Sequence, residues 1–296
     1  MKKALLLCCS VSLLTLSLLA QQSINETFEG VQEIQINTGT GDLVIDESNN
    51  NAVALTVEYD ADRIEPKIKH SGKKLILDEK QLDRNKSGKI KWTLRIPDEL
   101  IVTANLGTGR TDINGVYIKL KHNTGTGAVH LAGVSGNLTV NSGTGHIDVS
   151  QSKGRFDLNS GTGNLSLDNV SGKFSLNSGT GNVKVVNSEA TDESSLNSGT
   201  GNVSLVLSKP ATGDLSLNSG TGNATLEFNG QTIAGAFEMS CSEKHGSISA
   251  PFDFDHTERI DNGGRNNFTL KKTAKIGSGG PKIKVSTGTG KATVKN

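Results

Sequence analysis

Apolar and polar residues alternate along most of this chain with a period of two, from Val31 to about Leu100 and again throughout the second half. Segments such as DLVID, AVALTVEY, KLILDE and KIKWTLRI show the pattern clearly. Alternation of this kind is typical of strands that bury one face. We therefore predict a β-strand region over residues 21–100, with Ser71-Gly72 as a tight hairpin turn.

Beyond residue 100 the alternation is organised by a repeated motif, whose clearest copy is LNSGTGNLSL at residues 158–167. Its first glycine recurs after 18, 18, 18, 18, 20 and 21 residues. These glycines are Gly107, Gly125, Gly143, Gly161, Gly179, Gly199 and Gly220. Two further copies lie near the ends, from Ile36 and from Val285. A fixed period of this length indicates stacked units that bury their apolar faces against one another.

Each repeat contains two aliphatic positions that flank a polar one, which indicates an in–out–in strand after a glycine corner. The first aliphatic column includes Val129, Ile147, Leu165 and Val183. An asparagine column from Asn105 to Asn218 predicts a hydrogen-bonded ladder between stacked coils about 4.8 Å apart. The repeat leaves no room for a crossover helix. We predict a parallel β-helix, or β-solenoid, with about 18 residues per coil, over residues 101–250.

The pattern weakens after Leu226. Residues 237–249 predict one more coil, with His245-Gly246 in place of the Gly-Thr-Gly corner. The segments NFTLKK, KIKVS and KATVKN predict final strands, with VSTGTG in a hairpin-like turn. We assign residues 251–296 to C-terminal strands that cap the array.

Residues 1–20 begin with Lys2 and Lys3 and continue as an apolar run, which indicates a secretory signal peptide cleaved near Ala20. The alternative is a leader retained as a membrane anchor. Cys8 and Cys9 do not indicate a lipoprotein, because the residue before them is not small. We therefore expect an exported protein, located in the periplasm, on the outer cell surface or in the medium.

Charge and composition exclude several partners. Without Lys2 and Lys3 the chain has 29 basic and 30 acidic residues, and no polybasic segment indicates nucleic acid or an anionic membrane. Membrane contact is expected only through a retained leader. The 35 glycines and the low aromatic content suit a solenoid better than a compact domain.

The leader, the alternating strands, the Ile96-Pro97 junction and the repeated strand, small-Gly, strand units together resemble a known bacterial family. It is the putative adhesin, or β-strand repeat, family called domain of unknown function 4097. The resemblance covers essentially the whole mature chain and implies a right-handed β-helix-like fold in an exported or envelope protein. Parallel crossovers also prefer the right hand. The family supplies no functional residues to carry over.

Glycine-rich loops and hydroxyl columns offer candidate chemistry, but their details favour a structural role. Gly161-Thr162-Gly163 lacks the third glycine and the helix of a dinucleotide site, and the turns lack the carboxylates of calcium-binding β-rolls. The threonines of the motif lie between two glycines rather than on a flat ice-binding grid. Sequons such as Asn164 and Asn202 lie in adjacent coils, too close for all of them to carry glycans.

The titratable residues show no catalytic or metal-binding arrangement. Asp148 and Asp157 come nearest to the acidic pair of a polysaccharide-cleaving β-helix, and a solvated surface explains them better. Cys241 and His245 are four residues apart without an orienting group, which favours a buried structural thiol. No histidine cluster has metal-ligand spacing. We assign no catalytic, cofactor-binding or metal-binding residue and expect no cofactor.

These observations predict an exported, non-enzymatic β-solenoid that binds or scaffolds at the bacterial cell envelope. Its ligand would be a glycan or a protein that contacts the outward Ser, Thr and Asn columns. One alternative is a carbohydrate-active β-helix enzyme. The other is a structural solenoid that assembles end to end, because open solenoid ends expose unpaired strands.

Overall fold

The computed structural model describes residues 21–83, 88–263 and 267–296. The predicted leader at residues 1–20, with Cys8 and Cys9, lies outside the described residues. Within these ranges all regular structure is β, in 25 strands. No helix in the described part of the chain is long and apolar enough to cross a membrane.

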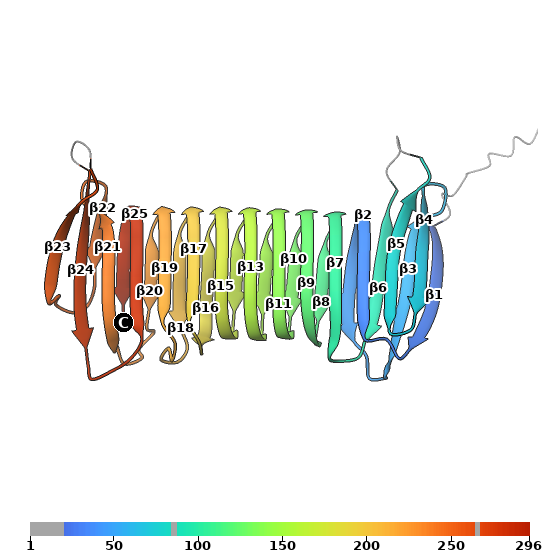
Figure 1. Cartoon of the computed structure of the whole chain (residues 1–296), viewed down its shortest axis with the longest axis horizontal. Coiled ribbons are helices and arrows are strands. Elements are labelled where there is room, and N and C mark those ends of the chain that lie inside the picture. The colour runs from blue at the N-terminus through green and yellow to red at the C-terminus, as the bar shows by residue number, and fades with distance from the viewer. Residues whose placement is uncertain (1–20, 84–87, 264–266) are drawn as a thin grey trace, which may run out of the picture.

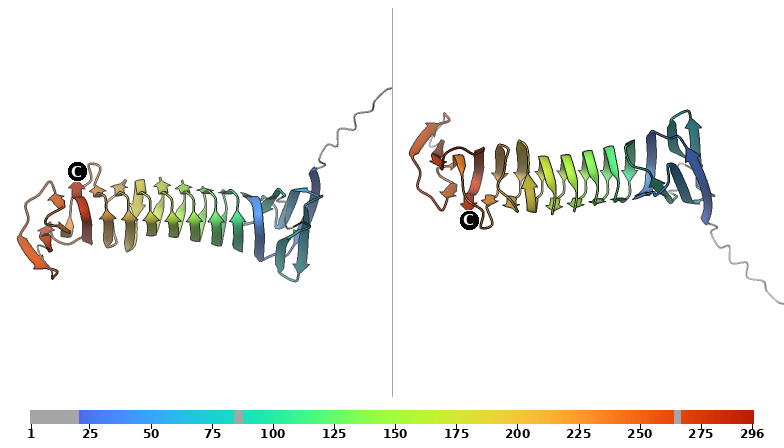
Figure 2. Two further views of the ribbon diagram at one scale, coloured as in Figure 1. Left: turned by 90° about the horizontal axis from the view of Figure 1, so that it is seen from above. Right: turned by 90° about the horizontal axis from the view of Figure 1, so that it is seen from below.

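The strands form an elongated, solenoid-like array of two facing parallel sheets, which we call sheet A and sheet B (Figure 1, Figure 2). In each repeat a strand of sheet B is followed by a shorter strand of sheet A. The sheet B strands are β7 (Leu100–Thr108), β9 (Tyr117–Thr126), β11 (Ser135–Thr144), β13 (Lys153–Thr162), β15 (Ser171–Thr180), β17 (Ser194–Thr200) and β19 (Leu215–Thr221). The sheet A strands are β8 (Thr111–Asn114), β10 (Val129–Ala132), β12 (Ile147–Ser150), β14 (Leu165–Asp168), β16 (Val183–Ala190), β18 (Val203–Leu207) and β20 (Ala224–Glu227). The last residues of β16 turn back into sheet B and pair with β15.

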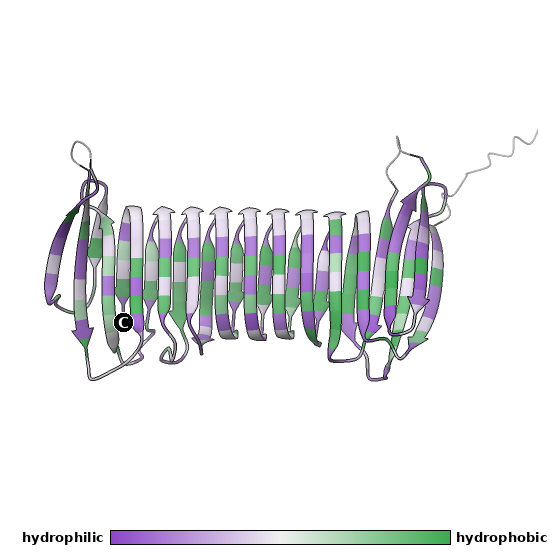
Figure 3. Cartoon of the chain, in the orientation of Figure 1, coloured by the Kyte–Doolittle hydropathy of each residue, from purple (hydrophilic) through white to green (hydrophobic). Residues whose placement is uncertain are grey.

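Register places each motif residue beside its equivalent in the next repeat. Leu158 pairs with Leu176 in sheet B, and Leu165 pairs with Val183 in sheet A. All four side chains are fully buried between the sheets. The alternation of apolar and polar bands is visible along each strand in Figure 3. The aliphatic columns predicted from the sequence are therefore the core of the array.

The two end copies of the motif are coils of the same array. β2 (Glu33–Glu47) passes through both sheets and pairs with β7 and β8, and β25 (Lys282–Lys295) passes through both and pairs with β19 and β20. The chain leaves the array after β2 and after β20 and returns to it each time. The hairpin predicted at VSTGTG is thus wrong: β25 is one strand that turns a glycine corner, as the other motif copies do.

Each excursion builds one end of the molecule. At the N-terminal end are β1 (Gln21–Glu29), β3 (Ala52–Asp60), β4 (Ile64–Ser71), β5 (Lys74–Gln81) and β6 (Ile90–Ile96). The predicted turn at Ser71-Gly72 is confirmed, since it joins the antiparallel strands β4 and β5. At the C-terminal end are β21 (Gly235–Ser242), β22 (Gly246–Ser249), β23 (His256–Asp261) and β24 (Phe268–Ile276). β21 and β22 form the predicted extra coil, which lies outside β25 rather than beside β20.

The glycine corners are required by the close approach of successive coils. Gly163 has a φ of +155°, and a Cβ there would lie 1.9 Å from the carbonyl oxygen of Gly145 in the preceding coil. An L side chain fits neither the torsion nor the space. The opposite corner, where the chain leaves sheet A, has a residue with a left-handed backbone torsion in most coils. Sequence reasoning did not detect this position, because the residue there changes from glycine to Asn169 (φ 55°) and Asn187 (φ 50°).

A single histidine interrupts the aliphatic core. His122 is fully buried in the column that holds Ala104 and Val140 in the neighbouring coils. Its Nδ1 lies 3.3 Å from the carbonyl oxygen of Ala104, and its Nε2 lies 3.2 Å from Oγ1 of Thr111. A carbonyl can only accept, so Nδ1 carries the proton and Thr111 donates to Nε2. Burial lowers the pKa of His122 to about 4, against the smaller raising effect of the Ala104 carbonyl.

Candidate functional site

The asparagine column forms the ladder that the sequence predicts. Each side-chain amide donates from Nδ2 to Oδ1 of the equivalent residue in the preceding coil, at 2.9 to 3.1 Å. The series runs through Asn105, Asn123, Asn141, Asn159, Asn177 and Asn197 and ends on Asn37. These amides satisfy one another, so the column is engaged in holding the coils together.

A second ladder follows the glycine corner and was not foreseen from the sequence. The side-chain oxygens of Asn164, Asn182 and Asn202 each accept the backbone N–H of the next coil's equivalent residue, at 2.8 to 2.9 Å. Sequence reasoning noticed Asn164 and Asn202 only as sequons. Their side-chain oxygens accept hydrogen bonds from backbone N–H groups of the glycine corner, which point along the axis of the array.

The serine of the NSG motif faces inward. Ser160, Ser178 and Ser198 are nearly fully buried, and each donates to a corner carbonyl of the preceding coil. The expectation that the motif's serine column lies on the outside is therefore wrong. The strand alternation explains this result, because the serine lies two residues after a buried leucine. The side chains that face outward in sheet B are those that alternate with the buried ones along each strand.

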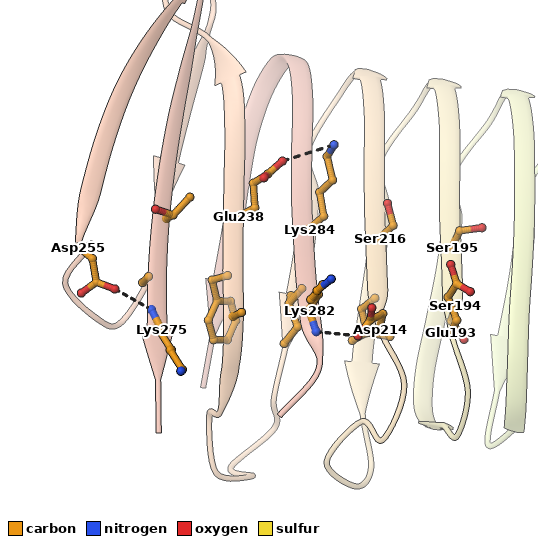
Figure 4. A pocket seen from close by; sticks show the side chains of 16 residues that line it. Glu193, Ser194, Ser195, Asp214, Ser216, Glu238, Asp255, Lys275, Lys282 and Lys284 are labelled. Atoms are coloured by element: carbon orange, nitrogen blue, oxygen red, sulfur yellow. Dashed lines mark hydrogen bonds and ion pairs between the residues drawn. The ribbon is translucent and has the colours of Figure 1, made fainter. Parts of the chain in front are cut away.

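The outer face of sheet B holds a groove of about 640 Å³ near the C-terminal end (Figure 4). It crosses β17, β19, β25, β21 and β24, and we call it the C-terminal groove. The outward side chains of Ser195, Ser216 and Ala236 are small, and charged side chains surround them. These are Glu193, Asp214, Glu238, Asp255, Lys275, Lys282 and Lys284.

Two of the lining acids come from the longest repeats of the array. Glu193 lies in the turn between β16 and β17, and Asp214 lies in the loop between β18 and β19. These are the repeats whose glycine spacings grow to 20 and 21. The irregular spacing is thus the sequence signal that could have located the groove, because added residues must leave the stacked strands.

The carboxylates of the groove are already engaged with the protein. Asp214 accepts the backbone N–H of Lys282 at 2.8 Å, and Asp255 accepts that of Lys275 at 2.8 Å. Within the described residues, neither lysine's ammonium group has an ion-pair partner. The groove therefore presents two free cationic side chains beside outward serine hydroxyls.

Glu238 lies between two lysines at the upper part of the groove. Its carboxylate is 3.2 Å from Nζ of Lys271 and 3.5 Å from Nζ of Lys284. Partial burial raises its pKa, and the hydrogen bonds and charges of the two lysines together outweigh that effect and lower it. Glu238 is therefore held ionised, as an acceptor rather than as a proton donor.

The candidate residues singled out in the sequence do not meet in one site. Asp157 is on β13 of sheet B, whereas Asp148 is on β12 of sheet A beside His130, whose Nδ1 is 3.3 Å away. Cys241 is buried in the core, and burial raises its pKa, while His245 is exposed. The described residues contain no group of three or more His, Cys, Asp or Glu side chains arranged to hold a metal ion.

The chain was compared with protein families and with solved structures. A family model described as Toastrack DUF4097 matches residues 31–235. A putative adhesin from Bacteroides fragilis is 15% identical, with a TM-score of 0.45 over 94% of this chain and 98% of its own. A putative lipid binding protein from Parabacteroides distasonis is 15% identical, with a TM-score of 0.39 over 93% and 96%. A putative cell adhesion protein from Clostridium sporogenes is 14% identical, with a TM-score of 0.26 over 93% and 99%. No curated protein matches the chain.

Proposed function

Because the chain belongs to the Toastrack DUF4097 family, the family recognised from its sequence, we propose that it is an exported, non-enzymatic protein that binds or scaffolds at the bacterial cell envelope. Residues 1–20 serve as a cleaved leader. The array acts as a stiff support, wound as a right-handed parallel β-helix with about 18 residues per coil. The ligand is a polar chain, foremost a glycan, that contacts the outer face of sheet B.

Each part of the chain has a role in this function. Residues 21–100 close the N-terminal end and supply one coil of the array through β2. Residues 101–250 supply most of its length, and residues 251–296 supply one more coil through β25 and complete the C-terminal end. Stacked ladders of side-chain hydrogen bonds resist bending and sliding of the coils, since each coil is fixed to both neighbours. A long rigid rod suits a protein that presents a binding face away from its attachment.

The observation that carries the proposal is the contrast between the ladders and the C-terminal groove. The Asn and Ser columns use their polar groups inside the array. The groove instead leaves the ammonium groups of Lys275 and Lys282 and the hydroxyls of Ser195 and Ser216 open to solvent. Hydroxyls and cations that converge on a groove of this size are what a polar ligand requires.

The electrostatics of the groove favour binding over glycoside cleavage. A glycosidase needs one carboxyl group with a raised pKa as the general acid. In the groove, lysines lower the pKa of Glu238, and Asp214 is held by a backbone amide. Both carboxyl groups therefore act as hydrogen-bond acceptors within the protein.

Glycan arrays and cell-wall capture with the full chain test the proposal. We expect specific capture that falls about tenfold in the variant Lys282→Glu, because the variant replaces a free cation with an acid beside Asp214. The matched control is Lys184→Glu on the outer side of sheet A, which should bind as the wild type does. Capture by neither array nor cell wall, or equal loss in both variants, would contradict the proposal.

Two further measurements address the alternative functions. Turnover of a polysaccharide that disappears in Glu238→Gln would show an enzyme. Size-exclusion chromatography with light scattering at high concentration would show a structural solenoid if the mass rises in steps of one chain. We expect no turnover and a single mass.

A further inference from the structure

Five basic side chains gather on the outer face of sheet B, away from the C-terminal groove. They lie on β9, β13 and β15 and are Lys119, Lys121, Lys153, Arg155 and Lys173, which we call the basic patch. The first four are exposed and Lys173 is half-buried. Because they are spread between residues 119 and 173, no basic segment is visible in the sequence, and stacking alone brings them together.

The register sets the pattern of the basic patch. Lys119 pairs with Asn137, Asn137 with Arg155, and Arg155 with Lys173, so these positions form one row along the axis. Successive positions are about 4.8 Å apart. Lys121 and Lys153 lie on the same face, two residues to either side of that row. The charges therefore follow the long direction of the molecule.

The charges of the basic patch are not compensated within the protein. In the described part of the chain Lys119, Lys121, Lys153 and Arg155 have no ion-pair partner, and Lys173 reaches Glu193 only at 4.0 Å. The one outward acid on β9, β11, β13 and β15 is Asp157, which accepts a hydrogen bond from Asn159. Uncompensated like charges on a rigid face attract an extended anion.

A groove of about 710 Å³ runs beside the basic patch, where the long strands begin. Its lining includes Lys119, Lys153, Gly136 and Gly154, and Glu99 is its one acidic residue. The stack requires these two glycines, because a Cβ on Gly136 would lie 2.1 Å from the carbonyl oxygen of Ile118 and one on Gly154 would lie 2.0 Å from that of Gly136. Tyr117, which is 50% exposed, lines the same groove and offers an apolar ring face.

We propose that the basic patch and this groove bind an acidic polysaccharide, with lysine and arginine on its carboxylate or sulfate groups and Tyr117 against a sugar ring. Charge-assisted hydrogen bonds of this type are strong and directional. Tyr117 and the exposed Ile101, which pairs with Lys119, are too little apolar surface to enter a membrane, and a single aromatic is no platform for stacked bases. The inference rests on the proposed binding function and adds a second site to it.

Calorimetric titration of the full chain with oligogalacturonate tests the inference. We expect binding that weakens with added salt, since exposed charges are screened. The variant Lys119→Glu with Arg155→Glu should weaken it at least about tenfold. Tyr117→Ala should weaken it less, and Tyr117→Phe should keep it. Circular dichroism and thermal unfolding check that each variant is folded. Lys119→Gln with Arg155→Gln provides a milder variant.

Controls separate this site from the C-terminal groove and from other anions. Lys184→Glu, on the outer side of sheet A, should bind oligogalacturonate as the wild type does. Loss in Lys282→Glu but not in the patch variants would assign the acidic glycan to the C-terminal groove, which overturns this inference and leaves the proposed function intact. No binding of oligogalacturonate, or tighter binding of oligothymidylate or phosphatidylglycerol vesicles, would also overturn it. A neutral maltooligosaccharide should not bind.

Discussion

The two ends of the array solve the same problem with opposite chemistry. Every amide of the Asn ladder donates toward the N-terminal end, so that end must supply acceptors and the other end must supply donors. At the N-terminal end Asn37 donates to the carboxylate of Asp78 at 2.6 Å. The series of amide bonds stops at Asn197, and the next asparagine of the column, Asn218, accepts the hydroxyl of Ser286 at 2.9 Å. In all of these bonds the donor lies on the C-terminal side.

The glycine corners show the same asymmetry. Glu79 accepts the backbone N–H of Gly39 at 2.7 Å and also the hydroxyl of Thr38, whereas Thr287 donates to the carbonyl oxygen of Gly222 at 2.7 Å. Both ends also use the same long-range connection, since Asn37 pairs with Asn105 and Asn218 pairs with Ser286, in each case 68 residues apart. Each excursion also lines a groove, with Asp78 and Glu79 at the N-terminal end and Lys275 at the C-terminal end.

The largest expected effect compares the stability lost by a glycine substitution in the middle of the array with that lost at its N-terminal end. Gly163→Ala should cost more than about 4 kcal/mol of unfolding free energy, because its Cβ would meet a backbone oxygen that cannot move without breaking the stack. Gly72→Ala, in the N-terminal hairpin, has nothing within 4 Å and only a left-handed torsion to oppose it. We expect about 1–2 kcal/mol there. Equal costs in denaturant titrations would contradict this account of the corners.

Acid should weaken the array through His122. The folded protein holds this imidazole neutral, with a pKa of about 4 against an ordinary value of 6.5. The unfolded chain therefore binds the proton first, and stability that is fully present above pH 6.5 is lost as the pH falls toward 4. The expected loss is roughly 3 kcal/mol, measured by denaturant titration across that range.

A matched variant isolates that contribution from those of the surface carboxylates. Thr111→Val with His122→Val replaces the buried polar pair with the aliphatic residues found in the same columns, such as Val129 and Val140. The double variant should lose the part of the acid sensitivity that falls between pH 6.5 and 4. An unchanged pH profile would show that His122 does not titrate in that window.

The smallest expected effects compare the two ends directly. Glu79→Ala should cost about 2 kcal/mol, because it removes a carboxylate acceptor and leaves the buried Thr38 hydroxyl unpaired. Thr287→Val should cost about 1 kcal/mol, since it removes one neutral hydrogen bond. Thermal unfolding of the two variants ranks them. A larger cost for Thr287→Val would contradict the role of charge in closing the N-terminal end.

The sequence was sufficient for the repeat and for its main ladder, because both follow from columns of identical residues. The stacking of Leu158 on Leu176 and of Asn141 on Asn159 follows from the regular spacing of the motif alone. The pairing of strands that are far apart in the chain could not be predicted in the same way. The placement of β25 between β20 and β21 depends on pairing between strands that are far apart in the chain, which no local pattern encodes.

The sequence likewise did not show which surface residues lie together in the folded protein. Glu193 and Asp214 reach the C-terminal groove through insertions that looked like irregular spacing, and Lys282 joins them from β25. The basic patch depends on stacking of residues that lie one and two repeats apart. Near-neutral overall charge concealed this local excess, since opposite charges elsewhere cancel it in the sum.

Lysine labelling with mass-spectrometric readout, with and without a bound cell-wall polysaccharide fraction, tests the central claim most directly. The claim is that sheet B binds through its outer face while the ladders only support it. We predict protection of Lys275 and Lys282 and unchanged labelling of Lys184 and Lys295, which lie on the sheet A side. Protection of Lys184 and Lys295, with Lys275 and Lys282 still labelled in the bound state, would contradict the account.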